Sequence, residues 1–302
     1  MLQIAADYYL NKFPIGVNLL EQNNSVVYFG DSVITTVADY DINTSSIVDM
    51  TKKLNPEHAF VDYSGGGLDA RYFEAVMEYI SQQQHKPEAV IIPVNLRSFS
   101  PVWEYNPTYQ FEKARFVLTS RTPLLYHFYE PLAVFRAVNA NTILWTNYYK
   151  LPVYYGNTQV GTVNDFDNKV KFASTTEENI RKKFIVAYMS ALKDSDNNLI
   201  YLKKTIDIAN KSGIKVFLYI TPVDYEMGEK YVGSDFLKMV RSNVNTVCSS
   251  MAKKNINCLD LSLSLEHKDF FSPPYPVEHL NQDGREYIAE QITKTFFRLK
   301  NN

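Results

Sequence analysis

Five short apolar runs, separated by segments with helical patterning, constrain the fold of this chain more than any other feature. The runs are rich in β-branched and aromatic residues and show little polar alternation, which indicates strands that are covered on both faces. Strands that alternate with helices form a parallel sheet with helices on both sides. The five predicted strands span residues 26–29, 58–63, 89–94, 215–220 and 256–261.

The segments between these runs read as helices with recognisable ends. Serine caps the predicted helix 45–54, Asp69 caps the helix 69–84, and Gly213 ends the helix 198–211. Five strands joined by right-handed crossovers predict a flavodoxin-like, three-layer α/β/α fold. We expect one domain over residues 1–302. Two further helices are predicted at 234–254 and 284–299.

One large segment interrupts this pattern after the third predicted strand. Residues 101–182 contain many aromatic residues, several prolines and no clean period. We interpret the segment as an insertion or lid over the functional edge of the sheet.

Composition excludes several classes of protein. The net charge of −2 over 302 residues gives no electrostatic reason to expect nucleic-acid binding. Cys248 and Cys258 have no histidine or further cysteine at metal-ligand spacing, so neither a metal site nor a cofactor is predicted. We expect two buried free thiols, and a single disulfide is the alternative for an exported protein.

The first 24 residues lack a basic region followed by a long apolar core. They therefore match neither a secretory signal peptide nor a membrane span. Two locations follow as alternatives: the cytoplasm, or an extracytoplasmic location with an anchor that precedes the given sequence.

The stretch VVYFGDSV at 26–33 carries the first candidate functional residue. Gly30 permits a sharp turn after the strand, and Ser32 then falls just past the strand's carboxyl end. Ligands of open α/β sheets bind at that edge. The alternative is a plain turn, because Gly, Asp and Ser all favour turns.

Three more features follow the carboxyl ends of other predicted strands. The glycine run 65–67 follows the second strand, Asn95 the third, and His279 lies after the fifth. Parallel strands present these ends at one edge of the sheet, so we expect the four features to meet.

The residue types suit acyl transfer. A serine hydroxyl is a weak nucleophile until a base takes its proton, and His279, one of the five histidines of the chain, is the candidate base for Ser32. The amide N–H of Gly67 or Gly66, the side-chain amide of Asn95 and the Ser32 N–H are candidate oxyanion donors. Each residue also has a purely structural explanation. The glycines can form a tight turn, Asn95 can cap a loop, and His279 can be an ordinary surface histidine.

In order and spacing, these blocks resemble the SGNH, or GDSL-type, hydrolase superfamily. PVNLRSFSP at 93–101 and EHLN at 278–281, followed by Gly284-Arg285, resemble a bacterial subgroup associated with membrane-bound O-acyltransferases. The resemblance implies action on acyl esters, with transfer of acetyl or similar groups onto cell-surface glycans. It also implies a glycan or acyl-ester substrate and a membrane-bound O-acyltransferase as partner.

One position departs from the superfamily pattern. The aspartate usually found three residues before the histidine is replaced by Pro276. We predict that Glu278 takes part in orienting His279. Asp224, Asp283 or a backbone carbonyl that supports a Ser-His dyad are the alternatives.

Two charged residues close to these blocks receive different interpretations. Asp31 is expected to order the turn around Ser32 rather than to act as the triad acid. Arg97 is a candidate for binding a carboxylate on a sugar or acyl donor, and a structural ion pair is the alternative.

The sequence thus predicts a serine esterase or O-acyltransferase, with an acyl-enzyme on Ser32 and an extracytoplasmic location. Its main alternative is a carbohydrate-binding or scaffold protein that has lost catalysis with the triad acid. A cytoplasmic lipase or thioesterase is a third reading.

The insertion adds a prediction about docking. Residues 124–135 are apolar nearly all round, although two prolines break the surrounding segment. Burial beneath the rest of the insertion is one explanation. The other is an exposed patch that docks against a membrane or a membrane-embedded acyltransferase.

Overall fold

The computed structural model describes residues 24–104, 147–167, 176–271, 276 and 278–297. A five-stranded parallel sheet has the order β2-β1-β3-β6-β7. Counted within this sheet, the order is second, first, third, fourth, fifth, which is the flavodoxin-like arrangement. The predicted fold class is therefore confirmed. The strands are β1 (Ser25–Gly30), β2 (Ala59–Ser64), β3 (Ala89–Val94), β6 (Lys215–Ile220) and β7 (Cys258–Asp260).

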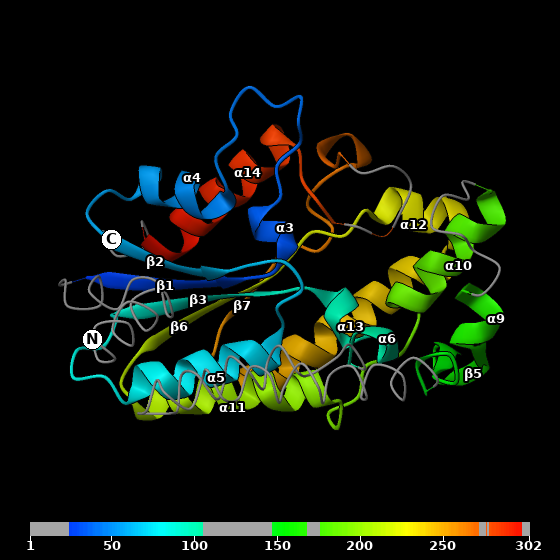
Figure 1. The fold of residues 1–302 in the computed structure, drawn as a ribbon, viewed down its shortest axis with the longest axis horizontal. Coiled ribbons are helices and arrows are strands. Elements are labelled where there is room, and N and C mark those ends of the chain that lie inside the picture. Colours follow the sequence, from blue (N-terminus) through cyan, green and yellow to red (C-terminus); the bar gives the residue numbers. More distant parts are fainter. Residues whose placement is uncertain (1–23, 105–146, 168–175, 272–275, 277, 298–302) are drawn as a thin grey trace, which may run out of the picture.

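Helices cover both faces of the sheet (Figure 1). On one face α4 (Ile47–Leu54) packs beside α14 (Gln282–Ile292), and on the other α5 (Ala70–Ser81) packs beside α11 (Asn197–Lys211). Every residue of β1 is buried. Its side chains divide between the two cores, Val26 and Tyr28 on the first side and Val27 and Phe29 on the second, which explains the absence of polar alternation.

Local sequence signals fix the ends of several helices. Ser46 and Asp49 form a reciprocal capping box at the start of α4. Asp69 caps α5 by accepting a hydrogen bond from the backbone N–H of Arg71. Gly213, with φ of 73°, follows the end of α11, as predicted. These ends set where each chain segment leaves its helix and re-enters the sheet.

Part of the predicted insertion has regular structure. The described residues between 101 and 182 include α6 (Pro101–Glu104), the antiparallel pair β4 (Pro152–Tyr155) and β5 (Thr158–Thr162), α9 (Val163–Asp167) and the start of α10 (Glu177–Tyr188). Helix α10 runs past the predicted boundary at residue 182. Phe184 and Tyr188 of α10 both pack edge-on against Phe236.

The proposed docking patch at 124–135 lies outside the described residues. Helix α12 (Tyr225–Val232) was not predicted from the sequence. Within the described ranges, no helix combines the length and the apolar character needed to cross a bilayer.

A disulfide joins Cys248 and Cys258, with 5.4 Å between their Cα atoms. The expectation of two free thiols is therefore wrong. The two cysteines are brought together because helix α13 (Asp235–Ala252) and β7 are consecutive elements, joined through a tight turn in which Asn255 has a φ of 58°. The disulfide therefore ties helix α13 to β7, the edge strand of the sheet.

Candidate active site

The turn after β1 places Ser32 at the carboxyl edge of the sheet. A Cβ added to Gly30 would lie 2.5 Å from the Ile34 side chain and 2.9 Å from the Cβ of Ser64, so only glycine fits. Asp31 then caps the short helix α3 (Ser32–Thr35) by accepting a hydrogen bond from Val33 N at 2.9 Å. As predicted, Asp31 orders the turn that holds Ser32.

Ser32 and His279 meet at this edge. His279 Nε2 lies 3.2 Å from Ser32 Oγ, so the predicted proximity of the two side chains is confirmed. The backbone around His279 is held by a hydrogen bond from Phe271 N to His279 O at 3.2 Å. The rings of Phe271 and His279 are stacked, with centroids 5.7 Å apart. These contacts fix the face that the imidazole presents to the serine.

The surroundings of His279 keep its imidazole neutral. Burial lowers the pKa of His279 to about 4, and the positive charge of Arg97 acts in the same direction. At neutral pH the ring is therefore unprotonated and able to accept the Ser32 proton.

No carboxylate of the described residues contacts the His279 side chain. Glu278, expected to orient His279, directs its carboxylate to Asn95 and Arg97 instead. Asp224, the alternative beyond β6, accepts a hydrogen bond from Nδ1 of His267 at 2.6 Å. Within the described part of the chain, Ser32 and His279 therefore form a dyad.

Asn95 lies between two carboxylates. Its Oδ1 accepts a hydrogen bond from Arg97 N at 3.0 Å, which fixes the orientation of the amide. Its Nδ2 then donates to Asp31 Oδ2 at 2.8 Å and lies 3.4 Å from Glu278 Oε2. Both amide hydrogens face carboxylates in this arrangement, so the predicted oxyanion role of Asn95 is not displayed.

Two backbone amides near the site, those of Ser32 and Gly67, are candidates for binding a substrate oxygen. A hydrogen bond from Gly65 N to Gly30 O at 3.1 Å holds the glycine run beside the β1 turn. Gly67 has a φ of 73°, a left-handed conformation that favours glycine. Neither Ser32 N nor Gly67 N donates to an acceptor within the described residues. Like Gly66 N, which also has no acceptor within the described residues, they remain candidate oxyanion donors.

Arg97 serves a structural ion pair, rather than lying open to a substrate carboxylate. Its Nε lies 3.2 Å from Glu278 Oε2, without the alignment of a hydrogen bond, and its Nη1 donates to Pro276 O at 3.2 Å. The guanidinium also lies over the Trp103 ring, 5.0 Å from its centroid. Only 13% of the Arg97 side chain is exposed.

Two carboxyl groups share this region, that of the buried Glu278 and that of the half-buried Asp31. Burial raises the pKa of Glu278 to about 7, against the opposing effect of the Arg97 charge, and the neighbouring Asp31 raises it further. Burial also raises the pKa of Asp31, against hydrogen bonding from Asn95 and the charge of Arg97. One guanidinium therefore faces two carboxyl groups that compete for ionisation.

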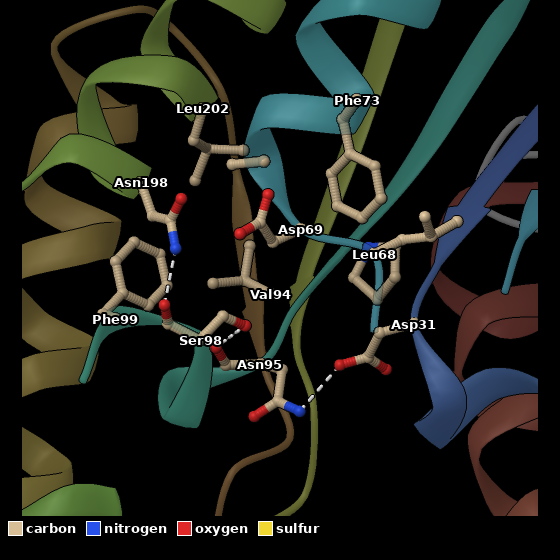
Figure 2. A pocket seen from close by; sticks show the side chains of 12 residues that line it. Asp31, Leu68, Asp69, Phe73, Val94, Asn95, Ser98, Phe99, Asn198 and Leu202 are labelled. Atoms are coloured by element: carbon tan, nitrogen blue, oxygen red, sulfur yellow. Dashed lines mark hydrogen bonds between the residues drawn. The ribbon is translucent and has the colours of Figure 1, made fainter. Parts of the chain in front are cut away.

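A cavity of about 20 Å³ lies behind Asp31 and Asn95 (Figure 2). Apolar side chains such as Leu68, Phe73 and Leu202 form much of its wall. This volume has room for about one water molecule and is too small for an acyl chain.

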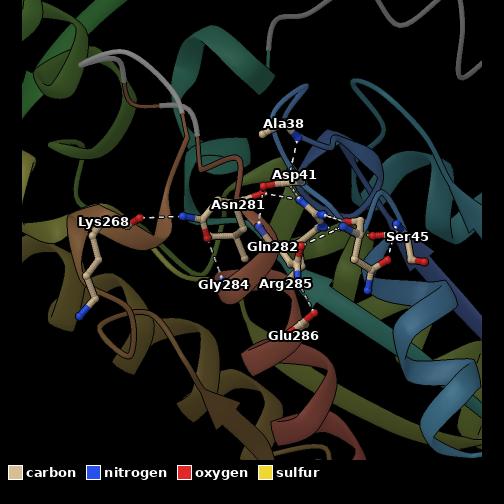
Figure 3. A network of polar contacts seen from close by, with 11 residues as sticks. Ala38, Asp41, Ser45, Lys268, Asn281, Gln282, Gly284, Arg285 and Glu286 are labelled. Carbon is tan, nitrogen blue, oxygen red and sulfur yellow. Dashed lines mark hydrogen bonds and ion pairs between the residues drawn. The ribbon is translucent and has the colours of Figure 1, made fainter.

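Sequence reasoning missed the network that anchors the histidine segment (Figure 3). Arg285 is fully buried, and its Nη1 donates to Asp41 Oδ2 at 2.7 Å and to Leu280 O at 2.9 Å. The same guanidinium donates to Asn43 O at 2.7 Å and to Ser45 O at 3.1 Å. The position of Gly284-Arg285 directly after the EHLN block was the one sequence feature that pointed to Arg285, but it did not identify the partners of its side chain.

This network joins the two halves of the site. Residues 38–45 follow the Ser32 helix, and Leu280 directly follows His279. Asn281 caps α14 through Gly284 N, and its Nδ2 donates to Lys268 O at 2.7 Å. One buried guanidinium therefore links the segment after the serine to the segment after the histidine.

No family model and no curated protein sequence matches the chain. Similar solved structures include a lipolytic G-D-S-L family protein from Veillonella parvula, with 13% identity, a TM-score of 0.42, and coverage of 91% of this chain and 98% of that one. A carbohydrate acetylesterase family member from Sinorhizobium meliloti has 7% identity, a TM-score of 0.40, and coverages of 90% and 96%. A lipase/acylhydrolase from Enterococcus faecalis has 13% identity, a TM-score of 0.38, and coverages of 90% and 94%.

Proposed function

We propose that this protein is a serine-dependent esterase or O-acyltransferase that works through an acyl-enzyme on Ser32. The observation that carries the proposal is the 3.2 Å contact between Ser32 Oγ and His279 Nε2 at the carboxyl edge of a parallel sheet. The lowered pKa of His279 supports it, because the base is then unprotonated at neutral pH.

The reaction follows from this geometry. Ser32 Oγ attacks the acyl carbonyl while His279 Nε2 takes its proton, and the developing oxyanion accepts hydrogen bonds from Ser32 N and Gly67 N. Protonated His279 then gives its proton to the leaving alcohol, which leaves the acyl group on Ser32. Water or a sugar hydroxyl attacks this ester next, and His279 again serves as base. Hydrolysis and transfer thus share the first half of the reaction.

The substrate we propose is an O-acyl, especially O-acetyl, group carried to or from a cell-surface glycan. The blocks at 93–101 and 278–281 support this choice through their resemblance to the acyltransferase-associated subgroup. A membrane-bound O-acyltransferase is the proposed acyl donor. Co-purification of the two proteins from membranes, followed by glycan acetyl analysis, tests the partnership.

A non-catalytic glycan-binding protein is the second candidate. Two observations favour it: no carboxylate among the described residues contacts His279, and both hydrogens of the Asn95 amide are engaged. Loss of a triad acid lowers kcat by about 10⁴ in serine proteases. A binding protein would retain the fold without turnover.

Fluorophosphonate labelling separates the two candidates. We expect intact-mass spectrometry to show one adduct per chain, and peptide mapping to place it on Ser32. His279→Ala should slow the labelling strongly, because the base is lost, whereas Lys253→Ala at an exposed position should not. A wild-type protein that remains unlabelled after long exposure would exclude an activated serine.

We propose an extracytoplasmic location on the basis of the Cys248–Cys258 disulfide. Disulfides persist in oxidising compartments and are rare in the cytosol. Alkylation of the protein in intact cells, before lysis, should leave both cysteines unmodified. Two alkylated cysteines would instead place the protein in a reducing compartment.

The disulfide should also contribute measurably to stability. It closes a short loop, with a sequence separation of 10. The double replacement Cys248→Ser/Cys258→Ser should lower the free energy of unfolding by roughly 2–3 kcal/mol, since the unfolded chain regains freedom. Urea unfolding with and without reductant measures this, and the double variant should show no reductant effect. Equal urea midpoints for wild type and the double variant in the absence of reductant would contradict the prediction.

A further inference from the structure

The residues directly before the nucleophile and the base share one hydrogen-bond donor. Asp31 precedes Ser32, and Glu278 precedes His279. Asn95 Nδ2 donates to Asp31 Oδ2 at 2.8 Å and lies 3.4 Å from Glu278 Oε2. A single amide nitrogen at the end of β3 is thus placed between the two chain segments that must meet for catalysis.

Arg97 strengthens the histidine side of this connection. Its guanidinium reaches Glu278 Oε2 at 3.2 Å and Pro276 O at 3.2 Å, so it contacts two positions just before His279. Asn95 Oδ1 in turn accepts the backbone N–H of Arg97 at 3.0 Å. The two residues therefore act from one short 3₁₀ turn, Leu96–Phe99, which Asn95 caps.

We propose that Asn95 and Arg97 are positioning residues that hold Ser32 and His279 at reacting distance through Asp31, Glu278 and Pro276. This inference rests on the proposed function. The Asp31–Asn95–Glu278–Arg97 bridge takes over the task of a triad acid by fixing the backbone on both sides of the dyad. It assigns Asn95 to the bridge, in place of the oxyanion.

Burial makes the bridge stiff. Asn95 is 5% exposed, and the Glu278 side chain is 1% exposed. Water therefore has little access to Asn95 and Glu278, and an unpaired group left there would be costly. A displacement of about 1 Å between reacting groups can lower a rate about 100-fold. A bridge of this kind thus has a large effect on kcat without touching substrate.

A double-mutant cycle tests the assignment of Asn95. We compare kcat for p-nitrophenyl acetate in Asn95→Ala, Glu278→Gln and the double variant. Each single change should lower kcat by about 10- to 100-fold, since a displacement of about 1 Å costs up to that much. The double variant should be no slower than the slower single variant, because both changes break one bridge. If the loss of kcat in the double variant equals the product of the two single losses, the bridge is wrong and Asn95 is again a candidate oxyanion donor.

The pH profile provides a readout that a purely structural role would not move. The charged groups facing Glu278 are Arg97 and Asp31, and the pKa of Glu278 lies at about 7. Ionised Glu278 pairs with Arg97, so kcat should rise as pH increases through about 7. Glu278→Gln should remove this inflection and keep the one near 4 that belongs to His279. An inflection near 7 that survives in Glu278→Gln would contradict the bridge.

Conservative variants and matched controls complete the test. Arg97→Lys keeps a cation but cannot hold both Glu278 and Pro276, so its kcat should lie between those of wild type and Arg97→Ala, with KM nearly unchanged. Glu290→Gln and Arg241→Ala, at exposed positions on α14 and α13, should match wild type. A raised KM with unchanged kcat in Arg97→Ala would instead make Arg97 a substrate-binding residue.

Failure of the bridge and failure of the proposed function give different results. If Ser32 is not a nucleophile, wild-type protein will resist fluorophosphonate and Ser32→Ala will not alter turnover. If only the bridge is wrong, wild-type protein will be labelled on Ser32, and Asn95→Ala and Glu278→Gln will behave independently. Thermal unfolding of each variant identifies any that fails to fold, and Glu278→Gln, which keeps the side-chain shape, then serves as the decisive variant.

Discussion

Ser32→Ala will lower turnover of p-nitrophenyl acetate by at least about 100-fold. Loss of the serine or histidine from a complete triad costs about 10⁶ in kcat, and loss of the triad acid alone costs about 10⁴. In a dyad that lacks the acid, about 100-fold of the rate enhancement therefore still depends on the serine, and this part is lost when the serine is replaced. The loss in Ser32→Ala will exceed about 100-fold if the Asp31–Asn95–Glu278–Arg97 bridge orients His279 as well as a triad acid would.

The measurement compares wild type, Ser32→Ala and Ser242→Ala at neutral pH. Ser242 is an exposed serine on α13 and provides a matched control for loss of a hydroxyl group. Circular dichroism and thermal unfolding should show that all three proteins share one fold, because Ser32 Oγ contacts only His279 among the described residues. Equal turnover in wild type and Ser32→Ala would assign the activity to another group or to a contaminant.

Arg285→Ala will lower the free energy of unfolding by about 3–5 kcal/mol, the usual cost of removing one partner of a buried ion pair. Arg285 is 0% exposed and satisfies Asp41 Oδ2 together with the carbonyls of Asn43, Ser45 and Leu280. Its removal leaves a buried carboxylate and three carbonyls without this donor. Urea unfolding measures the loss directly.

Two further variants show what Arg285 contributes. Arg241→Ala, at an exposed position on α13, should change the free energy of unfolding by less than about 0.5 kcal/mol. The double variant Arg285→Met/Asp41→Asn should recover only part of the loss, because three backbone carbonyls still lack a donor. Full recovery would reduce the role of Arg285 to charge neutralisation of Asp41.

The sheet could be predicted from the sequence because its strands are covered on both faces. Two predicted strands, 89–94 and 215–220, have the observed bounds. The first is an apolar run between Glu88 and Asn95, and the second begins at Lys215 and ends before Thr221. The fifth strand is shorter than predicted and spans Cys258–Asp260, because it pairs with β6 alone at the edge of the sheet. Helix α12 escaped prediction because it is short and weakly buried: only Gly228 is fully buried, and apolar residues such as Tyr225 and Tyr231 are partly exposed where they pack on the core.

The residues that meet at the site could be predicted, because their positions depend on where the strands end. The partners of the charged side chains could not, because they depend on the direction in which each side chain points. The positions of Ser32 and His279 beyond the carboxyl ends of the first and fifth strands predicted that they meet, and they do. Nothing in the sequence specified that Glu278 turns towards Arg97 and away from His279, or that Asp224 pairs with His267. These choices follow from the half-buried Arg97 cation, which attracts Glu278, and from the proximity of the segments after β6 and β7.

The Arg285 anchor also sets the order in which this chain gains reactivity as it is made. Its pairing with Asp41 spans 244 positions, and the contact between Ser32 and His279 spans 247. Synthesis delivers the amino-terminal part of a chain first, so Ser32 emerges long before any base can reach it. A nascent chain therefore carries Ser32 without its proposed base. The two side chains can meet only after the segment that holds His279 and α14 has docked on the sheet.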